Sequence, residues 1–195
     1  RTELAHGIFG SIPIGSGSYS IGDRLFQATT PKESINYGIG FLTEDRKNEG
    51  LVLGQSILAN ITMPTLSEFV RKGFIDFHSE RNTCEEEVDK FGISARNVDA
   101  RVNNLSGGNQ QKVLFSRWSR TCKGILILDE PTNKIVRDLA NDGVAILLIS
   151  SELPEIVGMC DRVLVMREGW ITGELEGNDI REESLMHLAT LSRTE

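Results

Sequence analysis

The chain has 195 residues, a formal net charge of −7, 39% hydrophobic residues and 25% charged residues. This composition is typical of a globular domain, or of a piece of a larger protein, and excludes a disordered chain. An acidic chain lacks the basic face of a sequence-independent nucleic-acid binder, so we expect no nucleic-acid partner. A phosphate ligand stays possible, because backbone N–H groups at a helix N-terminus bind phosphate without any net charge.

The apolar runs are short, and the longest covers residues 144–149. None approaches the ~20 residues that cross a bilayer, and the polar first residues do not resemble a signal peptide. The three cysteines, Cys84, Cys122 and Cys160, are far apart and lack metal-binding spacing. We expect reduced thiols in a cytosolic protein.

The first 50 residues predict short elements in quick succession. Apolar residues at helical spacing predict a helix over 3–9 that ends at Gly10. The Gly- and Ser-rich stretch 11–23 alternates apolar and polar residues, which predicts two edge strands around a turn at Ser16 and Gly17. A short helix over 32–37 and a buried strand over 39–43 follow, and a charged loop then covers 44–50.

The middle of the chain, residues 52–121, is helical in pattern. Helices are predicted over 56–63, 81–91 and 111–120. The remaining residues alternate strand and helix, as in a parallel α/β sheet. Strands are predicted over 125–128 and 144–149, helices over 134–140 and 152–159, and a hairpin over 162–167 and 170–175. Asp179 and Glu182 have capping-box spacing at the start of a last helix over 179–189.

Two motifs can carry chemistry. Ser106, Gly107 and Gly108 precede a helix, where free N–H groups and a partial positive charge favour a phosphate. Taken alone, the same residues are more often a simple helix cap. The strand 125–128 runs into Asp129 and Glu130, which could orient Mg²⁺ and polarise an attacking water. The alternative for that segment is a strand that ends in a solvated acidic turn.

Together these motifs resemble those of the ATP-binding-cassette (ABC) ATPases. Residues 105–113 resemble the family signature, and residues 125–132 resemble Walker B with its catalytic glutamate. Residues 40–52 and 148–155 are similar to the second, C-terminal ATPase domain of tandem monosaccharide importers of the ribose, galactose and xylose type. The resemblance implies an α/β P-loop NTPase core with a mainly parallel sheet, an antiparallel β subdomain and an inserted helical subdomain that carries the signature. By this resemblance the chain is one truncated ABC domain. Residues 1–51 and 122–195 would form its core and β subdomain, and residues 52–121 would form its helical subdomain.

The resemblance also implies a site for ATP and Mg²⁺. Arg1 and Thr2 stand where the Walker A loop ends, and Thr2 and Asp129 would hold the metal. The residues in catalytic positions would be Glu130, Glu44 and Ser151. The signature residues that would reach ATP bound by a partner domain are Leu105, Ser106, Gly107, Gly108, Asn109 and Gln110.

Several positions depart from the family pattern. The Walker A glycines are missing, and the glycines between 15 and 22 are not followed by a Lys-Ser or Lys-Thr pair. Glu44 replaces a glutamine, and Ser151 replaces a histidine whose cationic form a serine cannot supply. After Thr132 about a dozen residues are missing, so the helix 134–140 is short for a crossover between parallel strands. These departures imply an asymmetric pair of sites, of which this chain's own is the slower.

The implied protein is the ATP-binding subunit of a sugar importer, peripheral on the cytoplasmic face of the membrane. Its partners would be a second ABC domain, a transmembrane permease and, indirectly, a sugar-binding protein. Residues 51–53 with Ile57 and Leu58 either line the groove for the permease or belong to the core. Two alternatives stay open: a non-transport ABC ATPase, and a regulatory nucleotide-binding half without turnover of its own.

Overall fold

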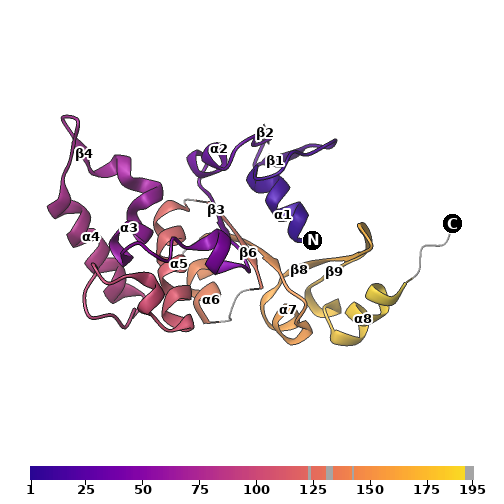
Figure 1. The fold of residues 1–195 in the computed structure, drawn as a ribbon. Helices are drawn as coiled ribbons and strands as arrows, with labels where there is room; N and C mark the ends of the chain where they lie inside the picture. The colour runs from indigo at the N-terminus through magenta and orange to yellow at the C-terminus, as the bar shows by residue number, and fades with distance from the viewer. Residues whose placement is uncertain (123, 131–133, 142, 192–195) are drawn as a thin grey trace.

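The computed structural model describes the chain except for residues 123, 131–133, 142 and 192–195 (Figure 1). Its central feature is a parallel sheet in the order β3-β6-β7, made of β3 (Ile39–Leu42), β6 (Ile125–Asp129) and β7 (Ala145–Ile149). Ile39 pairs with Ile125, and Asp129 pairs with Ile149. The carboxyl ends of the three strands therefore share one edge, and the predicted parallel α/β sheet is confirmed.

Before the sheet, the chain forms α1 (Thr2–Phe9), a hairpin of β1 (Tyr19–Ile21) and β2 (Arg24–Phe26), and α2 (Pro31–Asn36). The predicted turn at Ser16 and Gly17 is wrong. The strands instead meet around Gly22, whose φ of +58° suits the two-residue hairpin turn that Gly22 and Asp23 make.

The helical segment contains α3 (Ile57–Thr62), a 3-10 helix (Met63–Phe69), α4 (Phe77–Lys90) and α5 (Gly107–Thr121). A short hairpin of β4 (Val70–Arg71) and β5 (Phe74–Ile75) was not predicted. α4 begins about a turn earlier than predicted, because the Asp76 side chain accepts a hydrogen bond from the Ser79 N–H at 3.0 Å. Residues Arg46–Gly50, predicted as loop, form a turn of π-helix.

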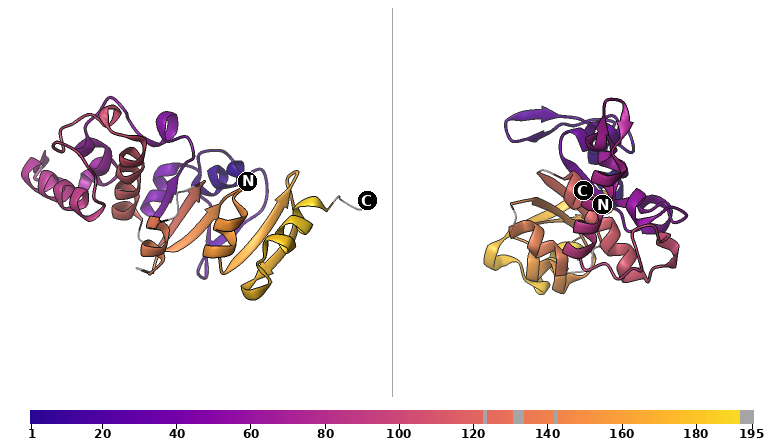
Figure 2. Two further views of the ribbon diagram at one scale, coloured as in Figure 1. Left: turned by 90° about the horizontal axis from the view of Figure 1, so that it is seen from below. Right: turned by 90° about the vertical axis from the view of Figure 1, so that its left-hand side faces the viewer.

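After β6 come α6 (Lys134–Asn141), α7 (Leu153–Met159), a hairpin of β8 (Arg162–Arg167) and β9 (Trp170–Glu176), and α8 (Glu182–Thr190). The predicted capping box is wrong, since Asp179 lies in a separate 3-10 turn and no side chain caps α8. Figures 1 and 2 place α3, α4 and α5 at one end of the molecule and the β8–β9 hairpin with α8 at the other.

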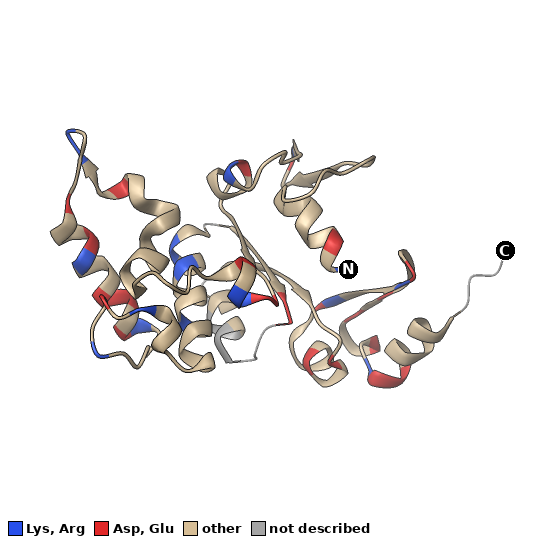
Figure 3. Cartoon of the chain, viewed as in Figure 1, with Lys and Arg blue, Asp and Glu red and all other residues tan. Residues whose placement is uncertain are grey.

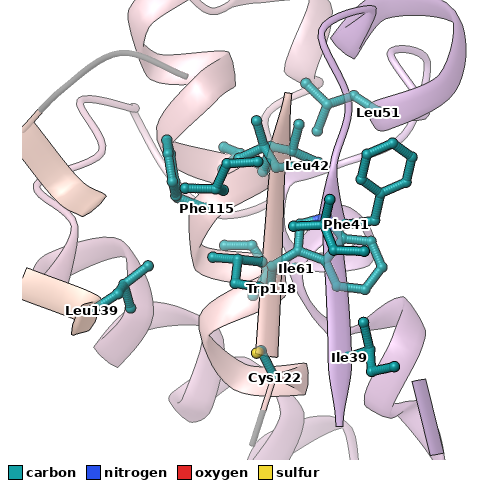
Figure 4. Packing of buried hydrophobic residues seen from close by; sticks show 14 of the residues in the cluster. Ile39, Phe41, Leu42, Leu51, Ile61, Phe115, Trp118, Cys122 and Leu139 are labelled. Atoms are coloured by element: carbon teal, nitrogen blue, oxygen red, sulfur yellow. The ribbon is translucent and has the colours of Figure 1, made fainter. Parts of the chain in front are cut away.

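The core lies where α5 packs against the sheet. Phe115 and Trp118 of α5 lie beside Phe41 and Leu42 of β3 (Figure 4), and the Trp118 ring meets the edge of the Phe9 ring of α1 at 5.7 Å between centroids. Phe115 is fully buried. Gly40 allows this close approach, because a Cβ there would stand 3.2 Å from the Trp118 ring of α5.

An apolar groove of about 900 Å³ separates β7 from β8. Leu147 and Leu164 line it from the two strands and are 40% and 46% exposed, and Arg1 and Leu4 of the first helix also contribute to its lining. Among the described strands, β7 pairs only with β6 and β8 only with β9. The groove therefore runs along the unpaired side of β7, and it reaches Ser150 and Ser151 after that strand.

The surface carries both signs of charge. Acidic and basic residues both occur along α4 (Figure 3), and Arg81 of this helix pairs with Asp99 at 2.8 Å. All three cysteines are free thiols, as predicted, and burial raises the pKa of the Cys84 thiol to about 12. None of the helices in the described part of the chain has the length and apolar character to span a bilayer.

Candidate functional site

The first cluster of predicted site residues forms at the carboxyl ends of β6 and β7. Arg1, the residue before α1, donates from Nη1 to the Ser150 carbonyl at 2.9 Å. Its Nη2 lies 3.7 Å from Glu130 Oε1. The structure thus brings together Arg1, Glu130 and the Ser150–Ser151 pair, which are far apart in sequence.

Glu130 is held by the serines that follow β7. Its Oε1 accepts hydrogen bonds from the Ser151 N–H at 2.9 Å and from the Ser151 hydroxyl at 2.8 Å. The Ser150 hydroxyl lies 3.5 Å from Oε2. The backbone of Glu130 has φ +49°, a conformation that costs a non-glycine residue energy and often marks functional positions. Ser151 therefore acts on this carboxylate as a neutral donor.

Asp129 is 1% exposed, and its Oδ2 has no hydrogen-bond partner among the described residues. A buried carboxylate oxygen without a donor is suited to a cation or to a water bound to one. Thr2, the other predicted metal ligand, is half-buried in the first turn of α1. Within the described ranges no three His, Cys, Asp or Glu side chains form a metal cluster.

Glu44 follows β3 and is exposed. Its carboxylate has no hydrogen bond or ion pair with any described residue, so the structure does not join it to Glu130. The neighbouring Thr43 hydroxyl donates to Glu49 Oε2 at 2.9 Å, and His6 Nε2 of α1 lies 3.6 Å from the same oxygen. Sequence reasoning missed this link between the end of β3 and α1, because His6 lies far from Thr43 and Glu49 in the sequence.

The second cluster is the start of α5. Ser106 is the N-cap, and its Oγ accepts a hydrogen bond from the Asn109 side-chain amide at 3.1 Å. Asn109 Oδ1 in turn accepts from the Ser94 N–H at 2.9 Å. Gly107 and Gly108 are exposed, and a Cβ at Gly108 would meet nothing within 4 Å. The helix-cap interpretation is thus correct for Ser106, and the two glycines leave the N–H groups of the first turn open to a ligand.

Gln110 and Leu105 face inward instead. Gln110 is 7% exposed, and its side-chain amide donates to the Val102 carbonyl at 3.1 Å. Leu105 is half-buried against the main core. The expected reach of the Gln110 side chain toward a partner's phosphate is not supported, because its amide is engaged within the same chain.

Arg46 lies beside the start of α5, and sequence reasoning did not single it out. Its Nη2 lies 3.0 Å from the position that a Cβ on Gly107 would occupy. The guanidinium has no hydrogen bond or ion pair with the described residues, and it is half-buried. Its signals in the sequence were a cation two residues after Glu44 in the predicted charged loop and its place in the stretch 40–52.

The residues expected at the permease groove divide into two kinds. Ile57 is 0% exposed and Leu51 6%, so both belong to the core and the groove expectation is wrong for them. Val52 between them is 45% exposed and accessible.

The sequence also matches a known protein family. Residues 2–133 match the family model described as ABC transporter. Since this match covers well over half of the chain, the protein belongs to the ABC transporter family, as an ATPase domain of it.

Within this family, the chain is similar to ribose import ATP-binding proteins. The chain is 43% identical over 204 residues to the ribose import ATP-binding protein RbsA of Bacillus licheniformis, covering 99% of this chain and 41% of that protein. It is 44% identical over 209 residues to ribose import ATP-binding protein RbsA 1 of Burkholderia ambifaria, covering 100% and 40%. The chain thus spans about two fifths of the length of these relatives. Both alignments are longer than 195 residues, so each relative has internal residues without a counterpart here. The gap predicted after Thr132 falls outside the described residues.

Solved structures agree on the fold. A nucleotide-free ATP-binding cassette from an ABC transporter superimposes with a TM-score of 0.74 at 19% identity, over 95% of this chain and 79% of that one. A dimeric cassette in a post-hydrolysis state with ADP and phosphate gives 0.73 at 19% identity, over 90% and 79%. The predicted ABC ATPase fold is confirmed.

Proposed function

We propose that this chain is the second ABC domain of a sugar importer and that it supplies its signature to ATP held by a partner ABC domain. The observation that carries the proposal is the start of α5, where Ser106 caps the helix and Gly107 and Gly108 stay exposed. Free N–H groups and the helix dipole favour the γ-phosphate at this point. The identity to ribose import proteins supports sugar as the transported class.

The chain's own nucleotide site would lie where Arg1, Asp129 and Glu130 meet. Arg1 would bind a phosphate, while Thr2 and the unpaired Asp129 oxygen would hold Mg²⁺. When bound, the metal neutralises phosphate charge. Glu130 would polarise the attacking water, but its Oε1 already accepts hydrogen bonds from the Ser151 N–H and hydroxyl and has the Arg1 guanidinium nearby. We therefore infer slow turnover at this site and fast turnover at the site that the signature completes.

The partners that follow are a second ABC domain, a transmembrane permease and a sugar-binding protein. The chain would bind the permease from the cytoplasmic face as a peripheral subunit. The exposed Val52 is the residue of 51–53 best placed for that contact, since Leu51 is in the core.

A second candidate is a regulatory half that binds nucleotide without turnover. The hydrogen bonds of Ser151 to Glu130 favour it, because they engage the Oε1 oxygen that would otherwise be open to an attacking water.

Replacing Glu130 with Gln tests whether the chain's own nucleotide site turns over more slowly than the site that its signature completes. In the assembled transporter we expect ATPase activity to fall far less than the ~10²–10⁴-fold that loss of a working general base costs. Steady-state ATP hydrolysis measures it. Glu155→Gln is the matched control, since Glu155 accepts from the same Ser150 hydroxyl at 3.1 Å but lies on α7. Complete loss of turnover in Glu130→Gln alone would show that the asymmetry is wrong.

Arg46 offers a test of the signature site. We expect Arg46→Gln to raise the KM for ATP about tenfold, because a hydrogen bond to a charged group contributes ~1.5–3 kcal/mol. Lys47→Gln removes a neighbouring exposed cation from the same turn and controls for net charge. Equal KM values in the two variants would remove Arg46 from the site.

A further inference from the structure

A buried guanidinium connects the signature helix to the segment that follows β3. Arg117 of α5 is 8% exposed. Its Nε donates to the Asn60 carbonyl at 2.6 Å, its Nη2 donates to Asn60 Oδ1 at 2.7 Å, and its Nη1 donates to the Gly50 carbonyl. Burial lowers the pKa of Arg117 to about 10. No carboxylate among the described residues pairs with it, so its acceptors are two segments of backbone and one amide.

Asn60 extends this contact to the next residues of the chain. It is 0% exposed, and its Oδ1 also accepts from the Val52 N–H at 2.9 Å. Its amide donates to the carbonyls of Val52 and Ser56, both at 3.0 Å. Arg117 and Asn60 together therefore attach residues 50–52 to α5 and α3.

The same segment touches α5 at a second point, nearer the signature. A Cβ on Gly50 would lie 3.0 Å from Leu114 of α5. The Leu51 N–H donates to the Arg46 carbonyl at 2.8 Å, and the Arg46 side chain reaches Gly107. Residues 46–52, which we name the linking segment, thus contact α5 both at its first turn and further along. Glu49, in the middle of the segment, accepts a hydrogen bond from the hydroxyl of Thr43, which follows β3.

Burying the Arg117 charge without an acidic partner has a desolvation cost. An apolar side chain of similar size would fill this space without that cost. An apolar side chain could not bind acceptors from two segments at once. A lysine carries its donors on one nitrogen and cannot reproduce the spread of the guanidinium. The geometry therefore favours a linkage over simple packing.

We propose that Arg117 is a positioning residue that makes the linking segment and the signature helix move together. A shift of the linking segment at the end of β3 then changes the position of Ser106 and Gly107. This rests on the proposed function, because it gives the signature helix its task at ATP.

The test is hydrogen–deuterium exchange on the full chain in its assembled transporter, with and without Mg²⁺ and ATP. In the wild type we expect nucleotide to change exchange in both 46–52 and 106–112. In Arg117→Lys we expect nucleotide still to change the exchange of one of the two segments, 46–52 or 106–112. The nucleotide-dependent change in the other segment should fall at least severalfold. Arg120→Lys is the control, since Arg120 lies three residues on in α5 and pairs with the half-exposed Glu68 at 2.8 Å rather than with the linking segment. It should keep both responses.

Gly50→Ala is a second variant that perturbs the linkage from the opposite side, and it carries the test if Arg117→Lys does not fold. Coupled responses in both variants, or a wild type in which only one segment or neither responds, would overturn the proposal. The proposed function fails separately, if Ser106→Arg leaves ATP hydrolysis unchanged.

Discussion

Ser106→Arg is expected to abolish ATP hydrolysis by the assembled transporter, with a loss of at least ~10²-fold, the scale on which removing one preorganised donor from a reacting oxyanion acts. The arginine removes the N-cap of α5 and places a long side chain over the exposed N–H groups of Gly107 and Gly108. Loss of the cap alone costs ~1 kcal/mol of stability. Steady-state ATPase activity of the purified complex measures the effect.

Two controls separate the site from the cap. Asp76→Ala removes the N-cap of α4 in the same helical segment, away from the signature, and should keep activity. Ser106→Ala removes cap and hydroxyl without added bulk, so it should lie between wild type and Ser106→Arg. Activity of Ser106→Arg equal to that of Asp76→Ala would contradict the placement of ATP at α5.

Phe115→Ala is expected to lower the free energy of unfolding by ~3–5 kcal/mol, the range for truncating a buried phenylalanine. Phe115 is 0% exposed where α5 meets the sheet, so its loss leaves a cavity. Urea denaturation of the purified chain measures the change through the transition midpoint. Phe74→Ala is the control, because Phe74 is 80% exposed on β5 and should change stability by ~0.5 kcal/mol or less. A change below ~1 kcal/mol for Phe115→Ala would mean that the site has collapsed around the shorter side chain.

The sheet could be predicted because two of its strands are continuous apolar runs, residues 125–128 and 144–149. β6 is buried as such a run suggests, whereas β7 is only partly buried. The first hairpin was misplaced by several residues, since Ser16–Gly17 and Gly22–Asp23 are both good turn pairs. Tertiary packing decides between them: Tyr19 donates from its hydroxyl to the Ile8 carbonyl at 2.9 Å and so anchors the later strands to α1. The capping box failed because spacing alone cannot say where a helix begins.

The motif residues at both clusters could be predicted, because each motif is contiguous and lies at a strand end or a helix start. The contacts that arrange them could not. Arg46 lies beside Gly107, which is 61 residues later in the sequence (107 − 46). Arg117 binds the carbonyl of Gly50, which is 67 residues earlier. The inward direction of Gln110 likewise depends on the Val102 carbonyl, which no local pattern reveals.

Gly40 limits how this protein could be stabilised. Its φ is not in the left-handed region, so alanine would suit the backbone and would reduce the entropy of the unfolded chain, a gain of ~0.4–1 kcal/mol. Its Cβ would nonetheless stand 2.8 Å from Leu126 and 3.2 Å from Trp118, and overpacking of this kind costs ~1–3 kcal/mol. The same methyl group would push α5, and with it the signature, away from the sheet. Engineering for thermal stability should therefore leave this glycine unchanged. Glycine raises the entropy of the unfolded chain, but it lets α5 pack close to the sheet.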